Sequence, residues 1–221
     1  MIILGFDTCL DKMYVTLAQN DTIIDSRVIE TTQTHYHSAF LISTIKDILK
    51  VNNKTPNDVE LLTTNIGPGS FTGIRACTTV ARVFAQAKDL NVIGISSLEI
   101  IANTIETDKK FLVSLDARKG KGYCAIYQNG EELFSPKAIL LEELQEMVKK
   151  EDFEIITDDA MQKIIGGSNY IELNKDLGQT LTKLAYKKAN SENIDYSWRK
   201  LHPLYIQPAP VTIKKPITNN K

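Results

Sequence analysis

The stretch that decides the fold reads Gly67-Pro68-Gly69-Ser70-Phe71-Thr72-Gly73-Ile74-Arg75. It follows a short apolar run, Leu61 to Ile66, that is typical of a buried strand, and it leads into a run with helical spacing, Thr72 to Lys88. Glycine tolerates positive φ and close backbone approach, and a helix start leaves backbone N–H groups without intrahelical partners. The stretch is therefore interpreted in two ways: as an anion-binding loop, or as a tight turn that lets strand and helix pack closely.

The familiar phosphate-binding motifs do not fit this stretch. A P-loop ends in Gly-Lys followed by Ser or Thr, whereas Gly73 is followed by Ile74 and Arg75. A dinucleotide loop follows the pattern G-x-G-x-x-G, but its sixth position here is Thr72. Both interpretations stay open, and the residues that would form either an anion or nucleotide site or a structural loop are Asp7, Thr8, Gly67, Gly69, Ser70, Thr72, Gly73 and Arg75.

The apolar patterns on either side predict an α/β protein. In the first part we expect strands at 2–6, 13–18, 23–29, 61–65 and 91–95, and helices at 36–50, 72–88 and 96–105. A polar break at 107–110 separates this series from a second part, in which we expect strands at 111–115, 123–127 and 153–156 and helices near 140–148 and 177–185. We therefore predict two domains, 1–106 and 107–221, the second ending in an extended tail after Trp198.

The composition bounds the class of protein. The chain has 221 residues and a net charge of −1, with 43% hydrophobic and 24% charged residues, as in ordinary globular proteins. Such a balance gives no overall field that attracts nucleic acid. Cys9, Cys77 and Cys124 form no C-x-x-C pair, so we expect reduced, buried thiols and a cytoplasmic location. No apolar run approaches about 20 residues, and no signal peptide or membrane segment is expected.

Several motifs, taken in order along the chain, resemble a known family. An Asp that ends the first strand of a β-β-β-α-β-α unit resembles the ribonuclease-H-like lobe of sugar kinases, Hsp70 and actin. Within that group, four segments resemble the TsaB family, also called YeaZ: Phe6 to Cys9, residues 67–75, Asp116-Ala117-Arg118 followed by Tyr123, and Pro203 to Ile206. The resemblance implies two ribonuclease-H-like (actin/Hsp70-like) lobes, each a mixed sheet with helices.

The resemblance also implies a role in tRNA modification. Proteins of this family are non-catalytic partners of the paralogous transferase TsaD. Together with the small ATPase TsaE they transfer a threonylcarbamoyl group to N6 of adenosine 37 in tRNAs that read codons beginning with A. The family binds TsaD through helices of the first lobe. We therefore expect no activity and no cofactor in the isolated chain, and contact with tRNA only through the complex.

Chemistry of the chain's own is the main alternative. A phosphotransferase of this fold needs Asp7 to orient a magnesium-bound phosphate and a glycine-rich turn after it, but the next glycine after Asp7 is Gly67. Weak nucleotide binding and phosphotransfer stay open as the alternative function. His35 and His37 point roughly 200° apart on a helix, so we expect no metal site. Ser70 does not lie in a G-x-S-x-G elbow.

Two helices of the first part carry more apolar surface than a sheet can cover. In 72–88 the apolar arc spans about 200°, whereas a helix on a sheet needs about 100°. We expect a partner, or a second copy when the chain is alone, to cover the surplus, although the two helices covering each other remains an alternative. A homodimeric module outside tRNA modification is a third function. The predicted interface residues are Tyr36, Phe40, Gly73, Ala76, Cys77, Val80 and Phe84.

The last part of the chain is locally basic. Trp198-Arg199-Lys200 and Lys214-Lys215 are interleaved with aromatic residues such as Tyr205. Such a tail either contacts tRNA or is a solvated segment packed by its aromatic side chains, and the sequence leaves both open.

Overall fold

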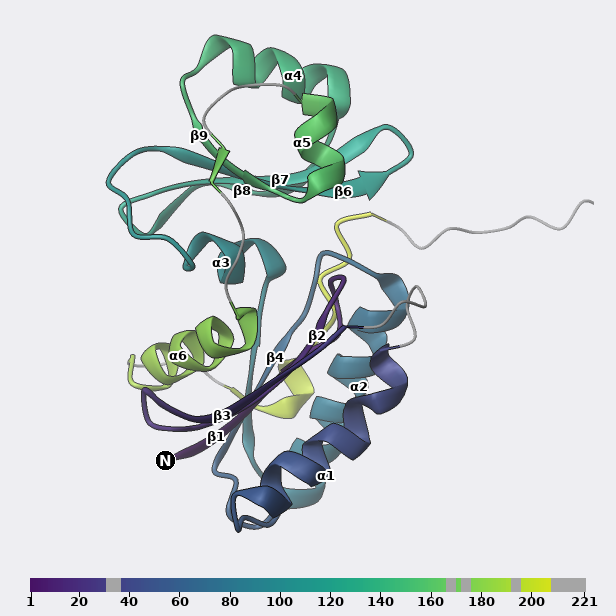
Figure 1. Cartoon of the computed structure of the whole chain (residues 1–221), viewed down its shortest axis with the longest axis vertical. Helices are drawn as coiled ribbons and strands as arrows, with labels where there is room; N and C mark the ends of the chain where they lie inside the picture. Colours follow the sequence, from purple (N-terminus) through teal and green to yellow (C-terminus); the bar gives the residue numbers. More distant parts are fainter. Residues whose placement is uncertain (31–36, 166–169, 172–175, 192–195, 208–221) are drawn as a thin grey trace, which may run out of the picture.

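The computed structural model describes residues 1–30, 37–165, 170–171, 176–191 and 196–207, and it shows two lobes, each built on a five-stranded sheet (Figure 1). The first sheet has the order β3-β2-β1-β4-β5. β1 to β3 form an antiparallel meander, and β4 and β5 continue the sheet parallel to β1. The bounds are Ile2–Asp7 (β1), Met13–Gln19 (β2), Thr22–Ile29 (β3), Leu61–Asn65 (β4) and Asn91–Ile95 (β5).

Helices cover both faces of this first sheet (Figure 1). Successive side chains of a strand point to opposite faces, so in β1 Phe6 packs among residues of α1 and α2, and Ile3 packs among residues of α3 and α6. The sequence of β1 is apolar throughout its length before Asp7 because both of its faces are covered. The helices are His37–Phe40 (η1), Leu41–Val51 (α1), Phe71–Lys88 (α2), Ser97–Ala102 (α3) and Leu177–Ala189 (α6).

The second sheet repeats the topology of the first. Its order is β10-β9-β6-β7-β8, so again a three-stranded meander is followed by strands parallel to its first member. Its elements are Phe111–Arg118 (β6), Lys121–Gln128 (β7), Glu131–Leu140 (β8), Leu141–Lys150 (α4), Glu154–Thr157 (β9), Asp159–Ile165 (α5) and Tyr170–Ile171 (β10). The predicted fold class is confirmed: two lobes of the ribonuclease-H-like type, each a mixed sheet with helices.

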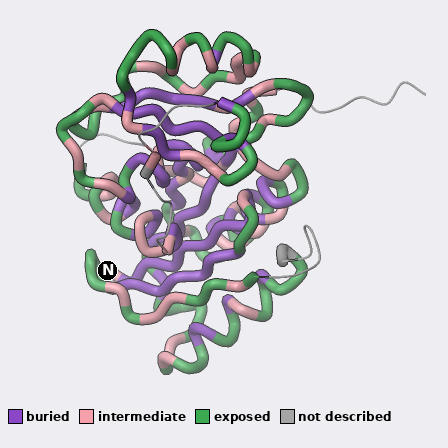
Figure 2. Tube along the Cα trace, turned by 45° about the horizontal axis from the view of Figure 1, so that its top comes forward, coloured by how far each residue is buried: buried purple, intermediate pink, exposed green. Residues whose placement is uncertain are grey.

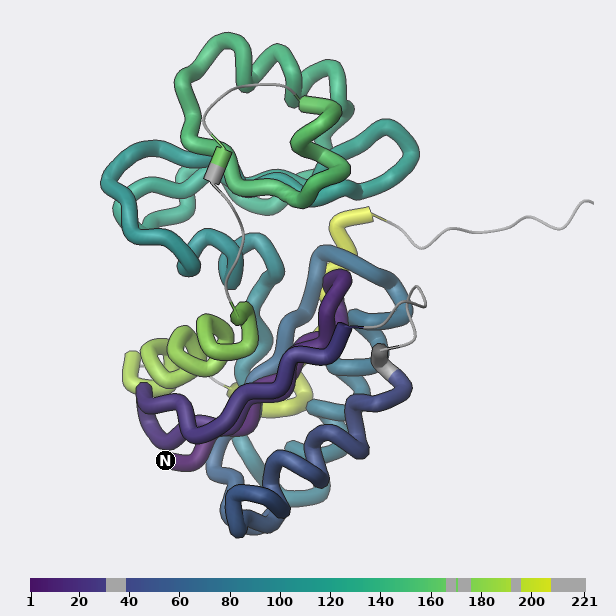
Figure 3. The backbone as a smooth tube through the Cα atoms, in the orientation of Figure 1, coloured from purple at the N-terminus to yellow at the C-terminus, as the bar shows by residue number. Residues whose placement is uncertain are grey.

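The chain that follows the second sheet lies on the first lobe. α6 packs against β1 and β2, and Gly5 makes room for it, because a Cβ at this position would lie 2.5 Å from Cγ2 of Thr182. Trp198–Lys200 (η2) follows, and Leu201 is buried in the core of the first lobe. Figure 3 traces this return in the green and yellow part of the chain. Residue 107 thus lies between the two sheets in sequence, but the predicted second domain, 107–221, includes segments that pack on the first lobe.

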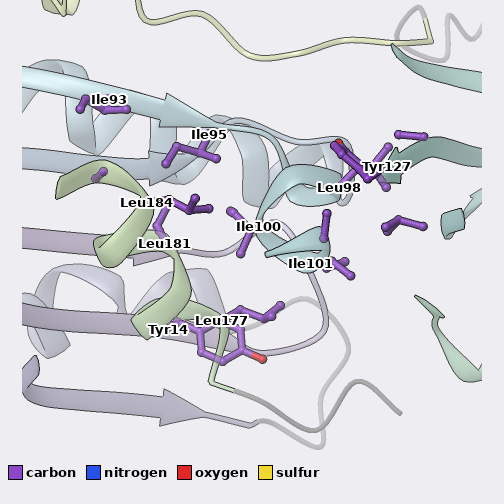
Figure 4. Close-up of a cluster of buried hydrophobic side chains, with 14 of the residues drawn as sticks. Tyr14, Ile93, Ile95, Leu98, Ile100, Ile101, Tyr127, Leu177, Leu181 and Leu184 are labelled. Carbon is purple, nitrogen blue, oxygen red and sulfur yellow. The ribbon is translucent and has the colours of Figure 1, made fainter. Parts of the chain in front are cut away.

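Buried apolar side chains join the two lobes. Figure 4 shows them running from Leu181 of α6, past Ile100 of α3, to Tyr127 of β7 in the second sheet. The central strands of both sheets are largely buried, whereas the edge strands β3 and β8 and the outer helices are partly exposed (Figure 2). Across the described part of the chain, none of the helices is both long and apolar enough to cross a membrane.

Candidate functional site

A cleft of about 1350 Å³ lies between the lobes. Residues 9–12 and 68–72 form its wall on the first lobe, and residues 115–119 and 157–160 form its wall on the second lobe. Residues 204–207 complete the lining. The turn after β1, the stretch 67–75 and the motifs at 116–118 and 203–206 therefore meet at one place, although they are far apart in the sequence.

The glycines of the stretch 67–75 are required by contacts within the chain. A Cβ at Gly73 would collide with the backbone oxygen of Thr8, and a Cβ at Gly69 would collide with the backbone oxygen of Cys9. Gly67 has φ of 99°, which side-chain-bearing residues rarely adopt. The start of α2 thus packs directly on the turn that follows β1.

The polar groups of this stretch bind the same turn. The backbone N–H of Ser70 donates to the oxygen of Cys9 at 2.7 Å, and the hydroxyl of Thr8 donates to the oxygen of Gly73 at 2.6 Å. Ser70 also caps α2, because its hydroxyl accepts the N–H of Gly73 at 3.3 Å. These contacts favour the structural-loop interpretation over an anion site.

Asp7 belongs to a buried network beneath this loop. One carboxylate oxygen accepts the N–H of Cys9 at 2.6 Å, and the other accepts the side-chain amide of Asn65 at 2.9 Å. The amide oxygen of Asn65 in turn accepts the N–H of Gly67 at 2.8 Å and the hydroxyl of Ser97 at 2.9 Å. The network ties the ends of β1 and β4 to the starts of the glycine stretch and of α3. The sequence analysis did not predict a role for Asn65. Its position was a signal, because it is the last residue of its strand and only Ile66 separates it from the glycine stretch.

Two buried thiols lie next to this network. Sγ of Cys9 and Sγ of Cys77 are 3.6 Å apart, and both lie close to the backbone oxygen of Asn65. Burial, and after it the neighbouring Cys77, raises the pKa of Cys9 well above its usual value. Burial also raises the pKa of Tyr14 on the cleft wall, and the carboxylate of Asp7 adds to this effect. These shifts keep the thiol of Cys9 and the hydroxyl of Tyr14 protonated at neutral pH.

On the second lobe, carboxylates again accept hydrogen bonds from backbone N–H groups. Asp116 accepts the N–H of Arg118 at 2.7 Å, which supports the turn between β6 and β7. Asp158 accepts the N–H of Asp116 at 3.0 Å and caps α5 by accepting the N–H of Met161 at 2.8 Å. The motif at 116–118 is thus explained by the turn that it stabilises.

The segment 203–206 connects the lobes across the cleft. The N–H of Leu204 donates to the oxygen of Ile66 at 2.8 Å, and the ring of Tyr205 lies 5.5 Å from that of Phe71. One residue later, the side-chain amide of Gln207 donates to the oxygen of Ala117 on the second lobe at 3.2 Å. This part of the predicted tail is therefore packed.

The predicted partner residues divide into two groups. Phe40 is 44% exposed, and Ala76, Val80 and Phe84 are half-buried. Gly73 and Cys77 are a correction, because both are buried within the lobe: Gly73 lies against Thr8, and Cys77 faces the sheet. Tyr36 lies outside the described residues. The structure adds three strongly exposed apolar side chains that the predicted interface did not include: Ile42 at 50%, Val51 at 64% and Val83 at 61%.

The side chains that commonly bind metal ions are dispersed over the described residues. In that part of the chain, no group of three or more His, Cys, Asp or Glu residues is placed to hold an ion. Of the histidines considered from the sequence, His35 lies outside the described residues.

Comparison with known proteins places the chain in a family. Residues 26–185 match the family model described as "TsaD: tRNA N6-adenosine threonylcarbamoyltransferase". The tRNA threonylcarbamoyladenosine biosynthesis protein TsaB of Bacillus subtilis (strain 168) is 31% identical over 157 residues, which cover 69% of this chain and 68% of the relative. The chain belongs to the TsaB (YeaZ) family.

Further relatives agree with this TsaB assignment. TsaB of Escherichia coli (strain K12) is 29% identical over 140 residues, covering 59% of this chain and 57% of the relative. The solved structure of YeaZ from Pseudomonas aeruginosa superimposes with a TM-score of 0.73 at 19% identity, covering 92% of this chain and 99% of that one. The structural likeness supports the fold, and the curated relatives connect the chain to tRNA threonylcarbamoyladenosine biosynthesis.

Proposed function

We propose that this chain is the non-catalytic partner subunit that binds and activates TsaD in the transfer of a threonylcarbamoyl group to N6 of adenosine 37 of tRNA. TsaE joins the pair in a ternary complex, and the chain alone forms a homodimer through the same surface. The observation that carries the proposal is an exposed apolar surface on the helices of the first lobe. In the same lobe, the glycine stretch 67–75 is packed against the chain's own turn after β1.

We call the apolar surface on η1, α1 and α2 the helix face: Phe40, Ile42 and Val83 are exposed, Ala76 is partly buried, and Val80 is partly buried against the core of the lobe. Phe40, Ile42 and Val83 are 44%, 50% and 61% exposed. Fully burying such a side chain is worth roughly 1.5–3 kcal/mol, so covering the exposed half of each contributes about 1 kcal/mol. Several such residues on adjoining elements suit the apolar centre of a protein interface.

The interior of the first lobe supports a role without chemistry. In an actin-like phosphotransferase, the carboxylate that ends the first strand must face the ligand. Asp7 is instead buried and accepts hydrogen bonds from Cys9 and Asn65. Gly69 and Gly73 bring the start of α2 onto the same turn, and the N–H of Ser70 is bonded to the oxygen of Cys9.

The proposal is tested by threonylcarbamoyl transfer to an unmodified tRNA in the presence of TsaD and TsaE. Phe40→Asp and Ala76→Arg place a charge on the helix face and should abolish co-purification with TsaD and the rescue of transfer. Leu133→Asp is the matched control, because Leu133 is 51% exposed on β8 of the other lobe. Normal rescue by both helix-face variants would contradict the interface.

Two other measurements distinguish the alternative functions. Nucleotide turnover by the isolated chain that is lost in Asp7→Ala, at unchanged thermal stability, would support an independent phosphotransferase. A chain that forms homodimers but leaves tRNA modification unchanged when depleted from cells would support an interaction module of another system.

A further inference from the structure

α2 presents three different stripes along its length. One is buried against the sheet, and a second carries Ala76, Val80 and Val83 of the helix face. At 100° per residue, Arg75, Thr79, Arg82 and Gln86 fall within about 60° of one another on a third stripe. This stripe faces η2 and the residues after it, since the guanidinium of Arg82 donates to the backbone oxygen of Leu201 at 3.3 Å.

The arginines of this third stripe lie against aromatic rings. The guanidinium of Arg75 lies 5.0 Å from the ring centre of Phe71, and that ring lies 5.5 Å from Tyr205. At the other end, Arg82 and Arg199 lie 5.9 Å and 4.5 Å from the ring centre of Trp198. The contacts form two clusters on the same side of α2, near its start and near its end, which together we call the basic–aromatic face: Phe71, Arg75, Arg82, Trp198, Arg199 and Tyr205.

This surface concentrates positive charge in a chain of net charge −1. Neither Phe71–Lys88 nor residues 196–207 contain an Asp or a Glu. Of the cationic side chains in these segments, Arg75, Arg82 and Arg199 lie on the face, whereas Lys88 points away from its stripe of α2 and donates to Asn57. The balanced total therefore hides a local excess that a polyanion would meet on approach.

We propose that the basic–aromatic face binds RNA directly. Guanidinium groups match the geometry of phosphate oxygens, and exposed rings offer stacking platforms for unpaired bases. Phe71 is 38% and Tyr205 is 46% exposed, so both rings retain accessible surface. The chain belongs to a family of tRNA modification, which makes a tRNA the RNA that this face would meet.

The inference goes beyond the proposed partner role, in which tRNA is contacted only through the complex. The helix face and the basic–aromatic face occupy separate stripes of α2, so one helix can serve both. Phe71 and Tyr205 also line the cleft, so the face adjoins its rim, and the carboxylates of Asp116 and Asp159 lie across the cleft on the second lobe.

The test is fluorescence anisotropy of a labelled, unmodified tRNA transcript with the isolated full-length chain over a range of salt concentrations. Arg75 and Arg199 are exposed, so about two phosphate contacts are available. At about 0.7–0.9 per contact, the logarithm of affinity should fall against the logarithm of salt concentration with a slope of about −1.5 to −2. Arg75→Glu and Arg199→Glu should each reduce the size of this slope by about 1.

Controls separate charge, stacking and folding. Arg199→Lys keeps the charge and should keep the slope, whereas Tyr205→Ala should weaken binding with the slope unchanged. Lys149→Glu, on exposed α4 of the second lobe, should leave binding unchanged. Unchanged binding in the double variant Arg75→Glu/Arg199→Glu, or no binding by the unaltered chain at low salt, would overturn the proposal. Equal affinity for poly-glutamate would reassign the face to an acidic protein.

The result is independent of TsaD, so failure of the partner role would leave it standing. In the reconstituted transfer reaction, the double variant should bind TsaD normally and reach the same maximal rate, with a raised KM for tRNA. An unchanged KM would again contradict direct RNA contact.

Discussion

The buried amide of Asn65 is the most sensitive point of the first lobe. Asn65→Ala removes a donor from the carboxylate of Asp7 and an acceptor from Gly67 and Ser97. A hydrogen bond to a charged group contributes about 1.5–3 kcal/mol, and a neutral one about 1 kcal/mol. Ser97 keeps a second acceptor, the oxygen of Pro68, but the N–H of Gly67 loses the acceptor that Asn65 supplies. We expect a total loss of about 3–5 kcal/mol in the free energy of unfolding.

Urea denaturation of the isolated chain, followed by circular dichroism, measures this loss as a lower midpoint. Ser43→Ala is the control, because the hydroxyl of Ser43 donates to the oxygen of Phe40 on the exposed surface of α1. It should change the free energy by less than about 0.5 kcal/mol. A loss below about 1 kcal/mol in Asn65→Ala would refute the view that this network organises the glycine stretch.

Two further predictions concern single buried side chains, those of Leu201 and Cys124. Leu201→Ala should lower the free energy of unfolding by about 2–5 kcal/mol, because Leu201 is buried in the first lobe; His202→Ala, next to it but exposed, should leave the denaturation midpoint unchanged. An equal midpoint for both variants would mean that the segment after η2 is not packed. Burial raises the pKa of the Cys124 thiol from 9.0 to about 12, so its contribution to stability is complete below pH 9 and is lost between about pH 9 and pH 12. Alkylation of Cys124 in the folded chain should accelerate only as the pH approaches 12, whereas urea-unfolded chain should react near pH 9; fast reaction of folded chain at pH 9 would show that the thiol is accessible.

The central strands of the first lobe could be predicted because β1 and β4 are buried throughout their length. Ile2 to Phe6 is an uninterrupted apolar run, and Leu61 to Ile66 followed by glycines indicates a strand that ends at a tight junction. The close approach at Gly69 and Gly73 was one of two interpretations. The contacts that favour the structural interpretation come from the turn after β1, which is distant in sequence.

Other elements gave weak signals for physical reasons. β8 was missed because it carries several charges and Pro136, which an edge strand tolerates and a central strand does not. α5 was missed because only Met161 and Ile165 are buried in its seven residues. The segment after η2 has no periodic pattern, since single contacts of Leu201, Leu204 and Gln207 hold it.

The interface prediction shows what a helical wheel can and cannot resolve. The wide apolar arc of α2 indicated that the sheet could not cover all of it, but not which part the sheet covers. Adjacent small residues are especially hard to assign to a face, because Ala76 and Cys77 have similar hydrophobicity. In the structure Cys77 faces the sheet and Ala76 is half-exposed.

The central claim is that this chain acts by binding its catalytic paralogue and has no chemistry of its own. Its most direct test measures threonylcarbamoyl transfer to tRNA by TsaD and TsaE without the chain, with it, and by the chain alone. The account predicts transfer only when TsaD and the chain are combined, together with a stable complex of the two on size-exclusion chromatography. Full transfer without the chain, or transfer by the chain alone, would contradict it.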